Sequence, residues 1–202
     1  MRRTLGFTVA TMATLALTLT LSGANVSAAT PRLSSELMTL TQLPQGWSAD
    51  SLSGSVSAGC LTNVFGLTNV LMARGVHQTS SAKVFFVDND GVPAISEMLA
   101  TYANPVAAYG KVVATLTSCK HVSAKAFGSN VTGSMEKKGF AHYASTSEAF
   151  AATVTILGTN FNAEIIVARK GDVVMAMVEA SLPPFNVHQF QGLIVKALAK
   201  VR

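Results

Sequence analysis

Residues 104–119, NPVAAYGKVVATLTSC, carry the clearest secondary-structure signals in the chain. Asn104 is a good N-cap residue, and Pro105 suits the first position of a helix, where no backbone N–H is needed. The apolar side chains recur at helical spacing on one face: Tyr109, Val112, Val113 and Leu116. Cys119 continues this face. We therefore predict an amphipathic helix over 105–119, ending on one of the 2 cysteines of the chain.

A second amphipathic helix is predicted over 186–201. Pro183 and Pro184 stop the preceding segment, and Asn186 can cap the helix. The apolar stripe of this helix consists of Val187, Phe190, Ile194, Ala197, Leu198 and Val201. The helix dipole favours positive charge near the C-terminus, where three basic residues stand: Lys196, Lys200 and Arg202.

Six segments are predicted as β-strands from their composition: 82–87, 92–102, 130–137, 148–157, 162–168 and 173–179. Glycine-containing turns separate the last three, which predicts antiparallel pairing. The DNDG stretch 88–91 is predicted as the turn of a hairpin between the first two strands. A calcium loop is the alternative for DNDG, but its glycine and acidic positions do not match an EF-hand. A helix is an open alternative for 95–102.

Two of these segments, 165–168 and 173–178, are apolar without alternation, which predicts that both faces of the sheet are covered there. Residues 37–43 are predicted as a short helical turn. Trp47, which follows the Pro-x-Gly turn at 44–46, is expected to plug the core where a strand enters the sheet. The predicted fold is α+β, with a mostly antiparallel sheet of about five or six strands flanked by two amphipathic helices.

The first residues have the layout of a secretory signal peptide. Arg2 and Arg3 precede an uncharged run over 5–21, and Val26-Ser27-Ala28 places small residues before a cleavage site. A transmembrane anchor is the alternative, although the run is short for a span and contains several threonines. No cysteine stands near the cleavage site, so a lipoprotein is not expected.

We therefore expect a signal peptide over 1–28, a flexible segment over 29–36 and a single α+β domain over 37–202. The mature protein is expected to be secreted, either extracellular or associated with the cell wall, with no stable membrane span after cleavage. The net charge of +5 reflects few acidic residues. Because Lys137-Lys138 and Arg169-Lys170 are isolated basic pairs, we expect no nucleic-acid partner.

The cysteine count agrees with export. Cys60 and Cys119 are the only cysteines, and an even number in an oxidising compartment predicts one disulfide. A reactive thiol pair is the alternative, but the two residues do not form a C-x-x-C motif. The Cys60–Cys119 disulfide is the only site that the residues themselves predict.

No catalytic, cofactor-binding or metal-binding motif stands out. The histidines lack the i, i+2 and i, i+4 spacings of zinc ligands: His77, His121, His142 and His188. GSVSAG at 54–59 lacks the spacing of a nucleophile elbow. Glu164 and Glu179 could face a cleft from neighbouring strands, but a structural or solvent-facing role is favoured over acid–base work. We expect no cofactor, no metal and no enzymatic activity.

The predicted mature chain is rich in methionine, a flexible residue that can line an adaptable apolar cleft. The residues are Met38, Met72, Met98, Met135, Met175 and Met177. The favoured alternative is that they fill the core.

Three stretches together resemble a group of exported actinobacterial proteins: LMTLTQLPQGW at 37–47, YANPVAAYGKVVATLTSC at 102–119 and IIVARKGDVVMAMVEA at 165–180. These secreted or lipid-anchored proteins are similar to the extracellular sensor domain of PknH-type Ser/Thr kinases. The resemblance implies a sheet flanked by helices, a cleft for a small ligand and no enzymatic activity. The kinase sensor domains typically carry two disulfides, whereas this chain can form only one.

The first functional hypothesis is therefore a secreted, non-enzymatic, sensor-like domain with a cleft for a small or lipidic ligand. The second is a cell-envelope or host-facing protein-interaction domain, whose working part would be a surface that meets an envelope protein partner. A hydrolase with an unrecognised site is the third.

Overall fold

The computed structural model describes residues 31–50, 77–126, 129–139, 143–144 and 146–202. The helices are α1 (Pro31–Glu36), the 3-10 turn η1 (Leu40–Gln42), α2 (Pro105–Ser118) and α3 (Val187–Lys200). The strands are β1 (Trp47–Ala49), β2 (Gln78–Asp88), β3 (Ala94–Tyr102), β4 (His121–Ala126), β5 (Ser129–Lys138), β6 (Thr146–Ile156), β7 (Thr159–Lys170) and β8 (Val173–Ser181).

The described strands form one antiparallel sheet of 8 strands in the order β1-β2-β3-β8-β7-β6-β5-β4. The prediction of five or six strands was too low, because β1 and β4 are short edge strands. All six predicted strands are present, and the DNDG stretch is a turn in which the Gly91 N–H donates to the Asp88 carbonyl oxygen at 2.8 Å. The helical alternative for 95–102 is wrong, since β3 pairs with β2 and β8.

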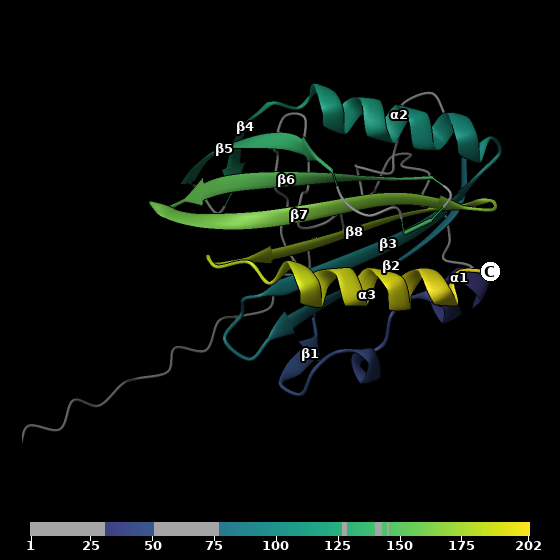
Figure 1. Ribbon diagram of the computed structural model, residues 1–202, viewed down its shortest axis with the longest axis horizontal. Helices are drawn as coiled ribbons and strands as arrows, with labels where there is room; N and C mark the ends of the chain where they lie inside the picture. Colours follow the sequence, from purple (N-terminus) through teal and green to yellow (C-terminus); the bar gives the residue numbers. More distant parts are fainter. Residues whose placement is uncertain (1–30, 51–76, 127–128, 140–142, 145) are drawn as a thin grey trace, which may run out of the picture.

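The two long helices cover opposite faces of the sheet. Figure 1 shows α2 and α3 separated by the central strands. Because side chains alternate along a strand, each central strand contributes to both layers of the core. The α2 layer includes Val112, Leu116, Phe150, Ile165 and Val178. The α3 layer includes Phe190, Ile194, Ile166, Met175 and Met177. All residues of β8 are buried, and the apolar run at 173–178 had predicted that both faces of the sheet are covered there.

The helix signals at 104–119 are confirmed. The Asn104 side chain accepts a hydrogen bond from the Ala107 N–H at 3.0 Å, and Pro105 is the first helical residue. One face of α2 is buried, and the Cys119 N–H closes the last turn by donating to the Leu116 carbonyl oxygen at 3.1 Å. The second predicted helix is α3, which Asn186 caps through the Gln189 N–H at 3.1 Å.

The segment expected to be flexible, 29–36, instead contains α1. Leu33 is buried in the α3 layer of the core, and the Arg32 guanidinium reaches Asp172 at 3.0 Å. These contacts over a sequence separation of 140 residues fix α1 beside the β7–β8 turn. Sequence reasoning missed α1 because a six-residue helix has little periodicity of its own.

Several sequence predictions lie outside the described residues. They concern the signal peptide at 1–28, GSVSAG at 54–59, Cys60, Met72 and His142. Cys119 is buried and is not a free thiol, but its pairing with Cys60 stays a prediction. Among the described helices, none combines the length and the apolar character that a membrane crossing requires.

Gly133 and Gly110 lie in opposite environments, so substitutions at these two positions test the packing of the fold. A Cβ on Gly133 of β5 would lie 2.3 Å from the Thr153 carbonyl oxygen, whereas a Cβ on Gly110 of α2 would meet nothing within 4 Å. We expect Gly133→Ala to destabilise the fold by about 1–3 kcal/mol, because backbone must move. Gly110→Ala should stabilise it by about 0.8–1 kcal/mol through helix propensity. Urea denaturation checks both, and equal effects of the two changes would contradict the described register.

Candidate functional site

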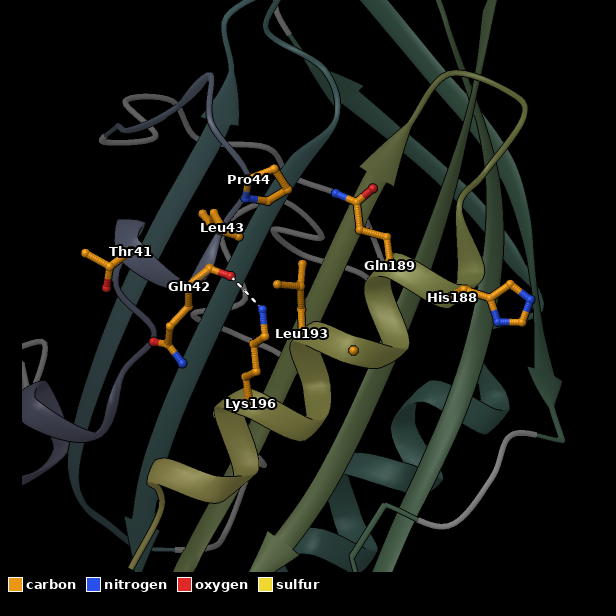
Figure 2. Close-up of a pocket in the computed structure, with 9 residues that line it drawn as sticks. Thr41, Gln42, Leu43, Pro44, His188, Gln189, Leu193 and Lys196 are labelled. Atoms are coloured by element: carbon orange, nitrogen blue, oxygen red, sulfur yellow. Dashed lines mark hydrogen bonds between the residues drawn. The ribbon is translucent and has the colours of Figure 1, made fainter.

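A groove of about 430 Å³ lies between the segment around η1 and the outer side of α3. Figure 2 shows Gln189, Leu193 and Lys196 extending from α3 toward the η1 segment, whereas the Thr41 and His188 side chains point outward at its margins. We call it the η1–α3 groove. Its lining consists of Thr41, Gln42, Leu43, Pro44, His188, Gln189, Gly192, Leu193 and Lys196.

The wall formed by η1 is fixed by local hydrogen bonds and by α3. The Thr39 N–H donates to the Gln42 side-chain oxygen at 2.9 Å, and the Leu43 N–H closes the 3-10 turn onto the Leu40 carbonyl oxygen at 3.1 Å. Across the groove, the Lys196 ammonium donates to the Gln42 carbonyl oxygen at 3.1 Å, as Figure 2 shows. The groove therefore depends on tertiary contacts between segments far apart in the sequence.

The other wall is α3, which its buried side chains hold on the sheet. Phe190 is buried, and Phe185 packs edge-on against its ring with centroids 5.9 Å apart. Gly192 lies on the groove side of the helix, where an added Cβ would meet nothing within 4 Å. Glycine inside a helix costs about 1 kcal/mol relative to alanine. The missing side chain at Gly192 thus keeps the groove open at the expense of helix stability.

The chemistry of the η1–α3 groove suits binding. Leu43 and Leu193 are buried and give it an apolar base, while Gln189, His188 and Lys196 provide hydrogen-bonding groups around it. Its described lining contains no carboxylate and no serine. An apolar surface with a few polar groups is the usual character of a small-molecule site.

A second pocket, of about 560 Å³, lies where α1 meets the end of α3. Two of its cations already hold the fold together: Arg32 binds Asp172 and Glu36, and the Lys200 ammonium donates to the Leu37 carbonyl oxygen. The Arg32 guanidinium lowers the pKa of Asp172 through a side-chain hydrogen bond. The Ser35 hydroxyl donates to the Arg32 carbonyl oxygen at 2.7 Å, and the Glu36 carboxylate in the same pocket is paired with Arg32. We assign this pocket a structural role.

Beneath the N-terminal segment lies a buried carboxyl that the sequence analysis did not single out. Glu97 of β3 is 0% exposed, and its Oε2 accepts the Met38 N–H at 2.6 Å. Burial raises the pKa of Glu97 to about 7, against the opposing effects of the Met38 N–H and Lys200. The available signal was strand alternation, because Glu97 shares a strand face with the apolar Ile95 and Leu99.

The two carboxyls that the sequence analysis did single out are brought together. Glu164 of β7 and Glu179 of β8 are directly opposite each other in the antiparallel ladder, on the α3 face. Burial, followed by the charge of Glu164, raises the pKa of Glu179 to about 7. Burial also raises the pKa of Glu164. Neither residue lines the η1–α3 groove.

The described methionines fill the core, as the favoured interpretation held. Met98 and Met135 lie in the α2 layer, and Met38, Met175 and Met177 lie in the α3 layer. None of these five lines the η1–α3 groove. Of the histidines, His188 lines the groove. Within the described ranges, no group of three His, Cys, Asp or Glu side chains could hold a metal ion.

Comparisons with known proteins show a similarity in fold. No protein-family model matches the chain. No curated protein matches it in sequence. Among solved structures, it is similar to the extracellular domain of PknH from Mycobacterium tuberculosis, with a TM-score of 0.67 and 11% sequence identity over 88% of this chain and 98% of that chain. At this identity the similarity shows a shared fold, and the chain has the α+β fold of a kinase extracellular domain.

Proposed function

We propose that this chain is an exported, non-enzymatic, sensor-like domain that binds a small or lipidic ligand in the η1–α3 groove. The observation that carries the proposal is the groove itself, whose volume of about 430 Å³ falls in the usual range for small-molecule sites. The fold shared with a kinase extracellular domain supports a sensor-like role. The signal-peptide pattern at 1–28 supports export.

The groove is better suited to binding than to catalysis. Its polar groups come from Thr41, His188, Gln189 and Lys196, and no carboxylate lines it to act with the imidazole. The five large apolar side chains exposed in the described residues come from different elements: Leu40, Val106, Leu157, Leu182 and Val195. This scatter gives no single surface on which to base the protein-interaction hypothesis.

The proposal predicts that filling the groove abolishes binding. Gly192→Leu places an isobutyl group in the η1–α3 groove without a backbone clash, because nothing lies within 4 Å of the added Cβ. Gly110→Leu is the matched control, since it adds the same group to an equally open helical position on α2. Native mass spectrometry of the purified protein reports any retained ligand. Titration with the fluorescent apolar anion 1-anilinonaphthalene-8-sulfonate measures binding.

We expect Gly192→Leu to lose the retained ligand and to weaken dye binding by at least about tenfold, with Gly110→Leu unchanged. Equal dye binding by both variants and the unmodified chain would overturn the groove as the site. That result would instead favour the protein-interaction hypothesis. Both substitutions improve helix propensity, so a loss of binding in Gly192→Leu would not reflect unfolding.

A further inference from the structure

One row of the sheet on the α3 face carries two facing carboxyls. The row crosses from β5 to β3 through Glu136, Ala151, Glu164, Glu179 and Ile95. Side chains directly opposite in an antiparallel pair have Cβ atoms about 4.5–5.5 Å apart. Glu179 is 2% exposed and Glu164 is half-buried. Two carboxyls therefore stand side by side, partly removed from water.

Four polar atoms around this pair lack hydrogen-bond partners. They are Glu164 Oε2, Glu179 Oε2, Ser181 Oγ and Tyr143 Oη, half of the buried side-chain atoms of this kind in the described residues. Ser181 is 7% exposed and, two residues after Glu179, lies on the same face of β8. Tyr143 packs against the α3 layer of the core, on the face that carries Glu164, and after burial the charge of Glu164 contributes to raising its pKa. Buried polar groups without partners are rare, so this cluster points to an unfilled site.

No described cation neutralises the two carboxyls. Lys138 of β5 is paired with Glu136 at 2.5 Å, and Lys137 is paired with Glu148 at 2.8 Å. Lys138 acts on Glu164 only through its longer-range charge. Two neighbouring carboxylates in a low-dielectric site repel each other, so the pair retains a proton unless a cation arrives. Among the described residues, the site has the Ser181 and Tyr143 hydroxyls as donors but no cation paired with either carboxyl.

The acceptors fit an ammonium group better than a metal ion. Calcium takes six to eight oxygen ligands, and the described residues contain no set of three metal-ligating side chains. A primary ammonium has three N–H donors, which match the two carboxyl oxygens and the Ser181 hydroxyl oxygen. Its volume is close to that of one water molecule, about 30 Å³. Tyr143 and Glu164 are only half-buried, so an attached alkyl chain can leave the site on their side.

We propose that the cluster of Glu164, Glu179, Ser181 and Tyr143 binds the primary ammonium group of an organic amine. Binding exchanges the proton held by the carboxyl pair for the cation: the carboxyl O–H bond breaks, the proton passes to solvent, and three N–H···O hydrogen bonds form. This site shares no residue with the η1–α3 groove, so it does not depend on the function proposed for the groove.

The test uses the full exported chain and n-butylammonium as the probe, with n-butanol as the uncharged match. Isothermal titration at about pH 6, in two buffers of different ionisation enthalpy, measures both affinity and proton release. Glu179→Gln and Glu164→Gln remove one titratable carboxyl each with little change of shape. Glu148→Gln is the control, because this β6 glutamate pairs with Lys137 at the surface.

We expect n-butylammonium to bind with release of up to about one proton, and n-butanol not to bind. Each cluster variant should weaken binding by at least about tenfold and release fewer protons, whereas Glu148→Gln should do neither. The other acidic and basic groups on the neighbouring elements are Glu97 of β3, Glu136, Lys137 and Lys138 of β5, Glu148 of β6, Arg169 and Lys170 of β7, and His188, Lys196 and Lys200 of α3. Comparison with the variants separates their titration from that of the pair.

The proposal is overturned if the folded chain does not bind n-butylammonium, or if the cluster variants bind it as well as the unmodified chain. Circular dichroism checks that the variants are folded. If a variant unfolds, NMR of the side-chain carboxyl carbons in the unmodified chain tests whether the amine binds at this site. Shifts of Glu164 and Glu179 on adding the amine support the site, and unchanged signals show a carboxyl pair that only shares a proton.

Discussion

Between about pH 4.5 and about pH 7, the free energy of unfolding should fall as the pH rises. Burial raises the pKa of both Glu97 and Glu179 from 4.5 to about 7 in the folded chain. In this range the folded state binds more protons than the unfolded state, so a rise in pH favours unfolding. A shift of this size corresponds to roughly 3 kcal/mol for each group, as an upper limit.

The direction of this pH dependence follows from the protonation of the two carboxyls in the folded and unfolded states. Below about pH 4.5 both carboxyls are protonated in both states, and the full stability is present. As the pH rises, the unfolded carboxyls ionise first, and stability is lost until the folded groups also ionise near pH 7. Asp172 acts in the opposite sense, because its lowered pKa contributes stability that is lost at acidic pH. The effect of Asp172 on stability therefore lies at a lower pH than the range in which the two glutamates act.

Glu97→Gln and Glu179→Gln test this result. Each removes one titrating group, and the amide oxygen that the first substitution introduces can still accept the Met38 N–H. Urea denaturation between about pH 5 and about pH 8 should show a flatter pH dependence for each variant, and greater stability than the unmodified chain at the upper end. Glu148→Gln, at a surface ion pair, should leave the slope unchanged. Identical slopes in all four proteins would rule out buried glutamates as the cause.

The largest single effect on stability is expected from Phe190→Ala. Phe190 is fully buried where α3 meets the sheet, and Phe185 packs against its ring. Truncation of a buried phenylalanine costs about 3–5 kcal/mol through lost transfer energy and the remaining cavity. Val195→Ala, on the outer side of the same helix and 56% exposed, should change stability by less than about 0.5 kcal/mol.

Chemical denaturation of the two variants separates packing of α3 from its intrinsic helix propensity. Both changes introduce alanine, the best helix former, so propensity alone would make both variants more stable. A small effect of Phe190→Ala would mean that α3 does not rest on the sheet through this side chain. The position of α3 as one wall of the η1–α3 groove, on which the proposed function depends, would then be wrong.

The sequence predicted the elements that carry their own local signals. Asn104 and Asn186 begin helices because a cap needs only a side chain and the next few backbone groups. Strands β6 to β8 were found from apolar composition and glycine turns. β4 was missed, and β1 was anticipated only at Trp47, because an edge strand is held by backbone hydrogen bonds on one side only. Its side chains can stay polar or small, and the alternating apolar positions of HVSAKA at 121–126 are one valine and two alanines, a weak strand signal.

The candidate sites were less predictable because they arise from tertiary contacts. The η1–α3 groove joins Gln42 to Lys196, 154 residues later, and no local pattern links the two. Its one sequence signal is Gly192, a helix-weakening residue inside an otherwise regular amphipathic helix. Glu164 and Glu179 were noticed as carboxyls on neighbouring strands, but only the register of β7 with β8 shows that they face each other.

The central position of β8 has a consequence for biogenesis. β3 and β8 are neighbours in the sheet although more than 70 residues of sequence separate them. Until the end of the chain has emerged, the edge of β3 that later meets β8 has no partner, and open strand edges promote association with other chains. Pairing over such separations is also slow. We therefore expect the sheet to close after translation, so that a nascent chain that still lacks β8 would depend on a chaperone or on rapid export for its solubility.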